Sequence, residues 1–267
     1  MTLAAAFAAL HSTPGPFLLP NAWDVASALL LADAGFPAVG TTSLGITAAA
    51  GLPDGAGAGR ELTVALAAAL ASRLPVPLTV DLEGGYSDDP AEVAALAAQL
   101  QTLGVAGINL EDGRCNGQLR PVAEHAGIIR AVTAAAPGLF VNARTDTYWL
   151  SVGSDDDRPR DTIHRLQAYR DAGASGVFTP GLTDLRVVEI VASTVMLPLN
   201  LLWQPDADLA ALRSAGVARI STGSALYRHA LTAVLLTADS ARTGNAPEGT
   251  PLTYHDVQQA LSRHLCR

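Results

Sequence analysis

The chain contains no lysine, and all 17 of its basic residues are arginine. Arginine keeps its proton at any workable pH and therefore forms no Schiff base. This absence excludes imine-forming aldolases and pyridoxal-phosphate enzymes, whose chemistry depends on a lysine amine. It also excludes a Walker-type phosphate loop, in which a lysine is obligatory. The glycine-rich segment 55–59 is therefore interpreted as a mobile loop.

Other scarce features narrow the class of protein further. Two cysteines, Cys115 and Cys266, are too few for a disulfide scaffold and are typical of the reducing cytoplasm. The net charge of −8 argues against nucleic acid or an anionic membrane as a partner. The long apolar stretches are interrupted by charges or glycine, so we expect no membrane span. Segment 1–10 is apolar with no basic residue before it, which predicts a short helix and not a signal peptide.

Short apolar runs alternate with longer helical patterns along most of the 267 residues. Eight such strand–helix units predict an α/β fold, a single (β/α)8 TIM barrel with an extra C-terminal helix. A doubly wound open sheet is the alternative, but no Gly-x-Gly-x-x-Gly follows the first strand. The expected strands are 17–19, 37–40, 76–80, 107–110, 139–142, 176–178, 197–199 and 218–220. The expected helices are 24–34, 61–73, 90–103, 122–135, 161–172, 184–192, 206–214 and 224–236.

The repeating pattern ends near residue 238, which suggests two parts of unequal size. We expect residues 1–238 to form the catalytic barrel. Residues 239–267 are predicted to be a linker containing glycine and proline, followed by a helix over 254–265. We expect this helix to pack on the barrel or on a neighbouring subunit.

Acidic residues stand where three of the predicted strands end. Asp81 and Glu83 follow one strand, Glu111 follows the next, and Asp146 comes just after strand 139–142, while Asp54 lies in a long loop after the second strand. Period-two spacing along a strand predicts that Asp81 and Glu83 point the same way. Carboxyl ends of parallel strands share one edge, so these carboxylates need a cation to neutralise them. Oxygen ligands without histidine or cysteine favour Mg²⁺, with Mn²⁺ also possible and Zn²⁺ disfavoured. The alternative is that each acid caps the helix that follows it.

Arg144 ends the fifth strand and faces the same edge. Its rigid guanidinium fork is suited to a substrate carboxylate or phosphonate. The alternative is a structural salt bridge from Arg144 to Asp146 or Glu111.

These residues carry a resemblance to a known group of enzymes. The motifs are Pro20 to Asp24, Thr-Thr-Ser-Leu-Gly at 41–45, Leu-Pro-Asp at 52–54, Asp-Leu-Glu-Gly-Gly at 81–85, Glu-Asp at 111–112, Ala-Arg-Thr-Asp at 143–146, and Asn200. Together they resemble the isocitrate lyase and phosphoenolpyruvate mutase superfamily, in the same order, from about Leu18 to His229. The resemblance implies a barrel fold, Mg²⁺ and small 2-oxo or 2-hydroxy acid substrates.

The resemblance also implies roles for individual residues. Asp81 would bind the metal directly, and Asp54, Glu83 and Glu111 would act mainly through metal-bound water. Ser43, Leu44 and Gly45 would hold the substrate carboxylate. The full candidate substrate-binding set is Ser43, Leu44, Gly45, Asp81, Arg144 and Asn200. The family usually has aspartate at the position of Glu83, so the charge is kept and the reach is one methylene longer.

Two departures from the family's lyases bear on the reaction. The lyases have a long gating loop with a Lys-Lys/Arg-Cys-Gly-His motif whose cysteine is the catalytic acid, whereas loop 113–120 is short and lacks lysine and histidine. Cys115 comes soon after Glu111 in this loop and is kept as a candidate beside the candidate catalytic residues Arg144 and Glu111. The lyases also carry a glutamate after the sixth-strand proline, but here Pro180 is followed by Gly181.

These observations predict a Mg²⁺-dependent enzyme that cleaves a C–C bond in a small 2-oxo or 2-hydroxy diacid through a metal-stabilised pyruvate enolate. Oxaloacetate decarboxylase or hydrolase activity is the leading expectation. Alternatives are phosphonopyruvate hydrolase or phosphoenolpyruvate mutase chemistry, methylisocitrate lyase activity, or an inactive barrel that binds a dicarboxylate. We expect a cytoplasmic homo-oligomer, dimer or tetramer, with no nucleic-acid or membrane partner.

Overall fold

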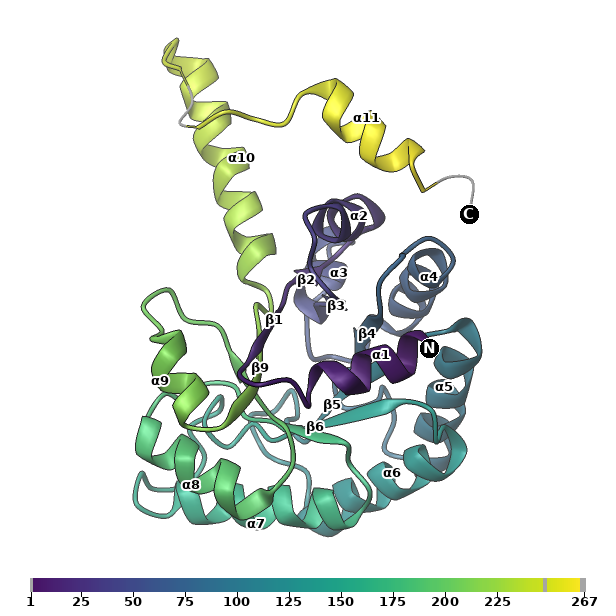
Figure 1. The fold of residues 1–267 in the computed structure, drawn as a ribbon, viewed down its shortest axis with the longest axis vertical. Coiled ribbons are helices and arrows are strands. Elements are labelled where there is room, and N and C mark those ends of the chain that lie inside the picture. Colours follow the sequence, from purple (N-terminus) through teal and green to yellow (C-terminus); the bar gives the residue numbers. More distant parts are fainter. Residues whose placement is uncertain (1, 247–248, 265–267) are drawn as a thin grey trace.

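Parallel strands form a ring with helices around it in the computed structural model, which describes residues 2–246 and 249–264 (Figure 1). The strands make one sheet in the order β1-β9-β8-β7-β6-β5-β4-β3-β2, and each neighbouring pair is parallel. They are β1 (Phe17–Leu19), β2 (Asn21–Ala22), β3 (Val39–Thr41), β4 (Leu78–Asp81), β5 (Gly107–Glu111), β6 (Phe140–Arg144), β7 (Gly176–Phe178), β8 (Leu199–Leu202) and β9 (Val217–Ser221).

The ring closes at Pro20, which separates β1 from β2. β1 pairs with β9 and β2 pairs with β3, so the two pieces act as one barrel strand with a neighbour on each side. Pro20 has no N–H to donate, but its carbonyl accepts the Gly40 N–H at 2.9 Å. With β1 and β2 taken as one strand, the barrel is eight-stranded, and the prediction of a (β/α)8 fold is confirmed.

The helices lie mostly outside the ring, between consecutive strands (Figure 1). They are α1 (Leu3–Leu10), α2 (Val25–Asp33), α3 (Ser43–Ala49), α4 (Arg60–Ala71), α5 (Pro90–Leu103), α6 (Val122–Ala135), α7 (Arg158–Asp171), α8 (Leu185–Val195), α9 (Leu209–Ser214), α10 (Ala225–Thr243) and α11 (Tyr254–Ser262). None of these helices is long and apolar enough to cross a bilayer.

Helix α3 occupies part of the segment that we expected to be a long loop. Its sequence contains glycine and threonine, which are poor helix formers, so tertiary packing must hold it. Ile46 and Thr47 are buried. A Cβ atom on Gly45 would lie 2.6 Å from Cβ of Trp23, so only glycine fits at this position. The helix places Ser43 and Leu44 at the carboxyl edge of the barrel.

Helix α1 closes the opposite, amino-terminal end of the barrel. Phe7 is fully buried and packs edge-on against Phe17 and Phe140, near the starts of β1 and β6. The His11 ring stacks on Phe140 with centroids 3.9 Å apart. Burial of the imidazole lowers the pKa of His11 to about 3, so it is neutral at physiological pH. An apolar base therefore leaves the carboxyl end as the open face.

The last two helices reach beyond the barrel (Figure 1). α10 continues to Thr243, past the position where the sequence pattern predicted a linker, and ends at Gly244 with φ of +75°. The chain then returns so that α11 lies beside α2. Asp33 of α2 pairs with Arg263 at 3.1 Å and with His264 at 3.0 Å. Leu265, the predicted last residue of this helix, and Cys266 lie outside the described residues.

Candidate active site

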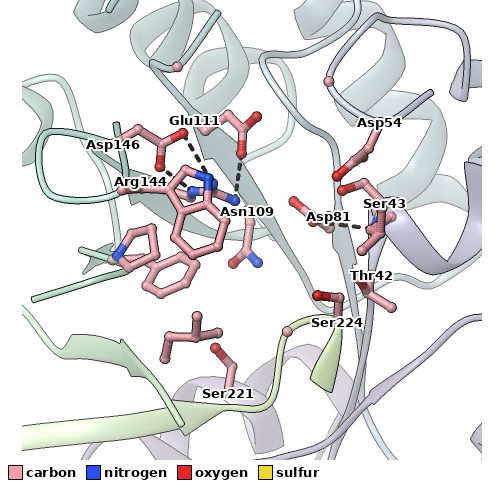
Figure 2. A pocket seen from close by; sticks show the side chains of 18 of the residues that line it. Thr42, Ser43, Asp54, Asp81, Asn109, Glu111, Arg144, Asp146, Ser221 and Ser224 are labelled. Atoms are coloured by element: carbon pink, nitrogen blue, oxygen red, sulfur yellow. Dashed lines mark hydrogen bonds and ion pairs between the residues drawn. The ribbon is translucent and has the colours of Figure 1, made fainter. Parts of the chain in front are cut away.

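A cavity of about 260 Å³ opens at the carboxyl ends of the strands (Figure 2). Its wall is polar on one side, where carboxylates surround a single arginine, and it has aromatic and apolar side chains on another. The lining residues are Asn21, Thr42, Ser43, Leu44, Asp54, Gly55, Asp81, Asn109, Glu111, Gly113, Arg114, Cys115, Arg144, Asp146, Trp149, Leu150, Phe178, Pro180, Leu202, Ser221, Gly223 and Ser224. A volume of this size suits a molecule of a few carbon atoms.

Strand register brings the predicted acidic and basic residues together. Asp81 is opposite Asn109 in the β4–β5 pair, and Glu111 is opposite Arg144 in the β5–β6 pair. All three strands run in the same direction, so their last residues share one edge. The sequence prediction that Asp81, Glu111 and Arg144 meet at one face therefore matches their positions in the structure.

Arg144 is held by two carboxylates (Figure 2). Its Nε and Nη2 donate to Asp146 at 2.6 and 3.1 Å, and its Nη1 pairs with Glu111 at 2.6 Å. The salt bridges that we considered as an alternative role are thus both present. A guanidinium has five N–H donors, and these contacts use three, so two remain for a ligand in the cavity. Arg144 combines a structural and a potential binding function.

Asp81 lies opposite Arg144 across the cavity and is only partly satisfied. Its Oδ2 accepts the Ser43 N–H at 3.4 Å, and its own N–H donates to Thr41 Oγ1 at 3.0 Å. Its Oδ1 is buried without a hydrogen-bond partner among the described residues. Burial raises the pKa of Asp81, and the nearby charge of Asp54 raises it further, while Arg144 opposes both effects. Among the described residues, no arginine forms a salt bridge with this carboxylate.

Glu83 faces a second, adjoining cavity, which corrects one expectation. Period-two alternation predicted that Asp81 and Glu83 point the same way, but β4 ends at Asp81, and Glu83 has φ of +50°. Glu83 instead lines the space beside Gly57, Tyr86 and Arg120, which also borders Glu111 and Cys115.

The glycine-rich segment 55–59 folds over Glu83, where Gly57 N–H donates to Oε2 at 3.2 Å. Oε1 has no partner among the residues that the structure describes. Burial raises the pKa of Glu83 to about 7, with smaller contributions from Asp54 and Asp81. Glu83 is therefore protonated in a large part of the molecules at neutral pH.

Glu111 lies between the two cavities and lines both of them. Burial raises the pKa of Glu111 well above its ordinary value, and the charges of Asp146 and Asp81 act in the same direction. Contact with Arg144 opposes this rise. The pKa values of Asp81, Glu83 and Glu111 are thus all raised, mainly because the three carboxyls are buried and also because they lie close to other carboxylates.

This arrangement fits a Mg²⁺ ion bound mainly through one carboxylate. Within residues 2–246 and 249–264, no three His, Cys, Asp or Glu side chains converge as direct metal ligands. Mg²⁺ commonly keeps several water molecules and uses only one or two protein carboxylates. Asp81, with one buried oxygen unpartnered, suits direct contact, and Asp54, Glu83 and Glu111 suit contact through water. A divalent cation would also offset the burial and the mutual repulsion that raise the three pKa values.

The remaining predicted substrate-binding residues divide into two groups. Ser43 and Leu44 line the cavity, but Gly45 and Asn200 are absent from the lining described above. Asn200 is buried and donates to Ser221 Oγ at 3.2 Å, and Ser221 itself lines the cavity. Gly45 packs against Trp23, and its lack of a side chain allows α3 to lie close to Trp23.

Cys115 is exposed in a tight loop over the mouth of the cavity. Backbone hydrogen bonds stabilise the loop: the Arg114 N–H donates to Gln118 O at 2.9 Å, and the Arg120 N–H donates to Asp112 O at 2.7 Å. Arg120 also pairs with Asp88 at 2.8 Å. The side chain of Cys115 borders both cavities, but its exposure does not provide the desolvated setting that tunes a thiol acid.

Several lining residues were not predicted as site residues. Asp146 anchors Arg144, and its position two residues after Arg144 was a usable signal. Ser221 ends β9 and Ser224 lies in the turn that follows it, where hydroxyl residues cluster at a strand end in the sequence. Trp149 and Phe178 supply the apolar wall, and single aromatic residues in the sequence gave no such indication.

Comparison with known proteins agrees with this fold. Residues 7–242 match the family described as phosphoenolpyruvate phosphomutase. An uncharacterised protein of Mycobacterium tuberculosis strain H37Rv is 43% identical over 253 residues, 94% of each chain. A 2-methylisocitrate lyase of Bacillus subtilis is 34% identical over 212 residues, 74% of this chain and 66% of that enzyme. A structure of oxaloacetate acetylhydrolase in complex with the product oxalate has a TM-score of 0.83 at 25% identity and covers 97% of this chain and 93% of that one.

The fold and the carboxylate-lined cavity define a barrel protein of the isocitrate lyase and phosphoenolpyruvate mutase superfamily. The chain belongs to the phosphoenolpyruvate phosphomutase family, and the resemblance inferred from the sequence motifs is confirmed. Its named relatives include a lyase, a decarboxylase and a hydrolase, which supports an enzymatic role.

Proposed function

We propose that this protein is a Mg²⁺-dependent enzyme that cleaves a carbon–carbon bond in a small 2-oxo diacid such as oxaloacetate. The observation that carries the proposal is the juxtaposition of a cation-deficient carboxylate cluster around Asp81 with Arg144. Two N–H donors of Arg144 stay available to an anionic substrate. The cavity of about 260 Å³ admits a four-carbon diacid.

The reaction needs an acceptor for the electron pair that the broken bond leaves behind. In decarboxylation of oxaloacetate, the C3–C4 bond breaks, CO₂ leaves, and the electron pair moves toward the 2-oxo oxygen until C3 takes up a proton. A bound Mg²⁺ would supply the positive charge that stabilises this developing oxyanion. Arg144 would hold a substrate carboxylate, and Ser43 and Leu44 would orient the other end beside Asp81.

Two structural observations weigh against methylisocitrate lyase activity, the leading alternative from the comparisons. That cleavage needs an acid and a base held by a closing loop. Gly181, at the position of the lyases' glutamate, has φ of +82°, and an added Cβ would lie 3.3 Å from the Tyr148–Trp149 backbone. A glutamate side chain is therefore strained there. Loop 113–120 contributes only the exposed Cys115.

An inactive dicarboxylate-binding barrel is the rival from another class. A binder has no physical need for a cluster of buried carboxylates whose ionisation is unfavourable, since such a cluster repels an acidic ligand. Phosphonopyruvate hydrolysis or phosphoenolpyruvate mutase chemistry would use the same cavity and remains the alternative for a phosphonate substrate.

The test is a substrate panel of oxaloacetate, 2-methylisocitrate, isocitrate and phosphonopyruvate with Mg²⁺, following release of pyruvate, of oxalate and, for isocitrate, of glyoxylate. We expect oxaloacetate to be the preferred substrate, activity to disappear in excess EDTA, and Asp81→Ala to be folded but inactive. Cys115→Ser should retain activity within about fivefold, since it supplies no essential acid. Full turnover in EDTA, or efficient methylisocitrate cleavage that depends on Cys115, would contradict the proposal.

We also propose that the enzyme works in the cytoplasm as a homo-oligomer. The low cysteine count supports the compartment. Helix α10 supports the assembly, because it carries exposed apolar side chains at Leu231, Val234 and Leu235.

A further inference from the structure

A buried arginine lies inside the barrel beneath the cavity and takes no part in the site described above. Arg219, on β9, has no exposed surface, and its Nη2 donates to Asn109 Oδ1 at 2.9 Å. Asn142, on β6, donates to the same oxygen from its Nδ2 at 2.8 Å. Asn109 therefore accepts two hydrogen bonds from within the barrel.

These bonds fix which way the Asn109 amide points. A guanidinium can only donate, so the Asn109 atom that faces Arg219 must be the oxygen, and the usual ambiguity between the amide atoms does not arise. The Nδ2 group is therefore directed away from Arg219. Asn109 lines the cavity and lies between Arg144 and Asp81 in Figure 2. Its amide presents N–H donors where an anionic ligand would lie.

Burial of Arg219 in this arrangement lowers the stability of the folded protein. Nε and Nη1 of Arg219 have no hydrogen-bond partner within the part of the chain that the structure describes. Burial lowers the pKa of Arg219 to about 9, although the charge of Asp81 acts in the opposite direction, so the side chain is still charged at neutral pH. No carboxylate is within salt-bridge distance of it among the described residues. A buried charge without a full set of partners destabilises a folded protein. A destabilising residue of this kind is expected where the residue is kept for a function.

We propose that Asn109 binds an anionic oxygen of the substrate through its Nδ2–H, and that Arg219 is a positioning residue that locks and polarises this amide. The ligand class, a planar 2-oxo acid or dicarboxylate, rests on the proposed function. A hydrogen bond to the oxygen acceptor withdraws electrons from the amide, which makes the opposite N–H a stronger donor. The positive charge thus acts on the ligand through Asn109 without entering the cavity.

The experiment measures oxalate binding by calorimetry with saturating Mg²⁺, and thermal stability without ligand. Asn109→Asp keeps the shape of the side chain and its hydrogen bond to Arg219, but it replaces the N–H donor with an anionic acceptor. We therefore expect oxalate affinity to fall by about 100-fold or more. The melting temperature should be unchanged or higher. Arg219→Met should lower affinity by about tenfold and raise the melting temperature, because an apolar side chain replaces an incompletely paired charge.

A double-mutant cycle separates positioning from a general structural effect. In an Asn109→Ala background, Arg219→Met should change oxalate affinity by less than about twofold, since its effect passes through the missing amide. Thr179→Val is the matched control, because Thr179 Oγ1 is another buried atom without a partner among the described residues. It should leave oxalate affinity unchanged.

Three outcomes would overturn the assignment. They are unchanged oxalate affinity in Asn109→Asp, an Arg219→Met effect that persists without Asn109, or an Arg219→Met protein that is both less stable and unchanged in affinity. Failure of the proposed function looks different. In that case the unmodified protein turns over none of the acids although it still binds oxalate, and the Asn109 assignment stands. An unmodified protein that binds no oxalate would overturn both proposals.

Discussion

Arg144 has the most constrained side chain of the candidate site. It makes a two-bond contact with Asp146 and a further ion pair with Glu111, and its guanidinium lies 5.6 Å from the centre of the Phe178 ring. An ammonium group cannot reproduce this planar set of contacts, because it is a point charge on a flexible stem. The geometry at this residue therefore depends on the shape of the fork as well as on its charge.

Arg144→Lys should lose activity by about 100-fold or more, although the charge is kept, because one carboxylate of the pair is left poorly satisfied and the ligand loses its donors. We expect stability to fall by about 2 to 4 kcal/mol, since Asp146 is buried. Steady-state kinetics and urea unfolding check both effects. Arg114→Lys, at a more exposed arginine of the same cavity, is the control and should change stability by less than about 1 kcal/mol. Unchanged kinetics in Arg144→Lys would assign Arg144 to the scaffold alone.

Residues at strand ends could be predicted from the sequence, whereas residues defined by side-chain contacts could not. Asp81, Glu111 and Arg144 directly end buried strands, and register alone brings them together. Glu83 could not be placed because the chain turns to a positive φ after β4. The link between Arg219 and Asn109 joins residues 110 positions apart and depends on rotamers inside the barrel, so no local pattern indicates it.

At the scale of elements, Asp112 connects the end of β5 to β6 and α7. It is fully buried and accepts hydrogen bonds from the hydroxyls of Thr145 and Tyr169 at 2.8 and 2.7 Å, from the Asp146 N–H at 2.9 Å, and from Arg165 at 3.2 Å. These bonds hold the turn that carries Asp146, and through Asp146 they fix Arg144. The positions of Asp146 and Arg144 in the site therefore depend on the carboxylate of Asp112.

Asp112→Asn should destabilise the protein by about 3 to 5 kcal/mol, because one acceptor oxygen becomes a donor facing other donors in a buried position. Urea unfolding followed by circular dichroism measures the loss. The control is Asp161→Asn, which removes the more exposed carboxylate paired with the same Arg165 and should cost less than about 1 kcal/mol. Equal effects in the two variants would mean that Asp112 is only one of several interchangeable partners.

The strand–helix order was predictable because buried parallel strands are short apolar runs, and glycine ends the helices before them. Two features of the fold could not be predicted in this way. The break at Pro20 divides one barrel strand, and a proline inside a strand is visible only as a local anomaly. Helix α3 contains poor helix formers and is held by burial of Ile46 and Thr47, which depends on the whole fold.

At the scale of the whole molecule, the raised pKa values link stability to pH and to the cation. The pKa of Glu83 is raised by burial from 4.5 to about 7. A raised carboxyl pKa favours the folded state below the ordinary value, and this contribution is lost as pH rises through the folded value. The raised pKa values of Asp81 and Glu111 act in the same direction. Metal-free protein should therefore become less stable from about pH 5 to pH 8.

We expect the melting temperature without metal to fall by roughly 5 to 10 °C over this range. Mg²⁺ should restore most of the loss at pH 8 and little at pH 5.5, where Glu83 is largely protonated. Scanning fluorimetry at several pH values, with Mg²⁺ or EDTA, measures both trends. Glu83→Gln should flatten the metal-free profile, because a neutral amide does not titrate. Stabilisation by Mg²⁺ that is equal at both pH values would contradict the carboxylate cluster as the cation site.

Helix α10 extends away from the barrel and leaves a large part of its length without intramolecular cover (Figure 1). Leu231, Val234 and Leu235 are 47%, 63% and 72% exposed. Their spacing of three and four residues places them on one face of the helix. An exposed apolar face of this kind is typical of a surface that a second subunit covers, and identical chains provide such a surface in a symmetric pair.

Leu235→Glu should therefore dissociate the assembly, because a buried leucine contributes about 1.5 to 3 kcal/mol and occurs once in each chain of the contact. Light scattering after size exclusion, over a range of concentrations, measures the mass. Ala233→Glu is the control, since Ala233 is exposed and lies about 200° around the helix from both Leu231 and Leu235. It should leave the mass unchanged. If the unmodified protein is a monomer at high concentration, or if both variants keep the same mass, α10 is not the contact between subunits.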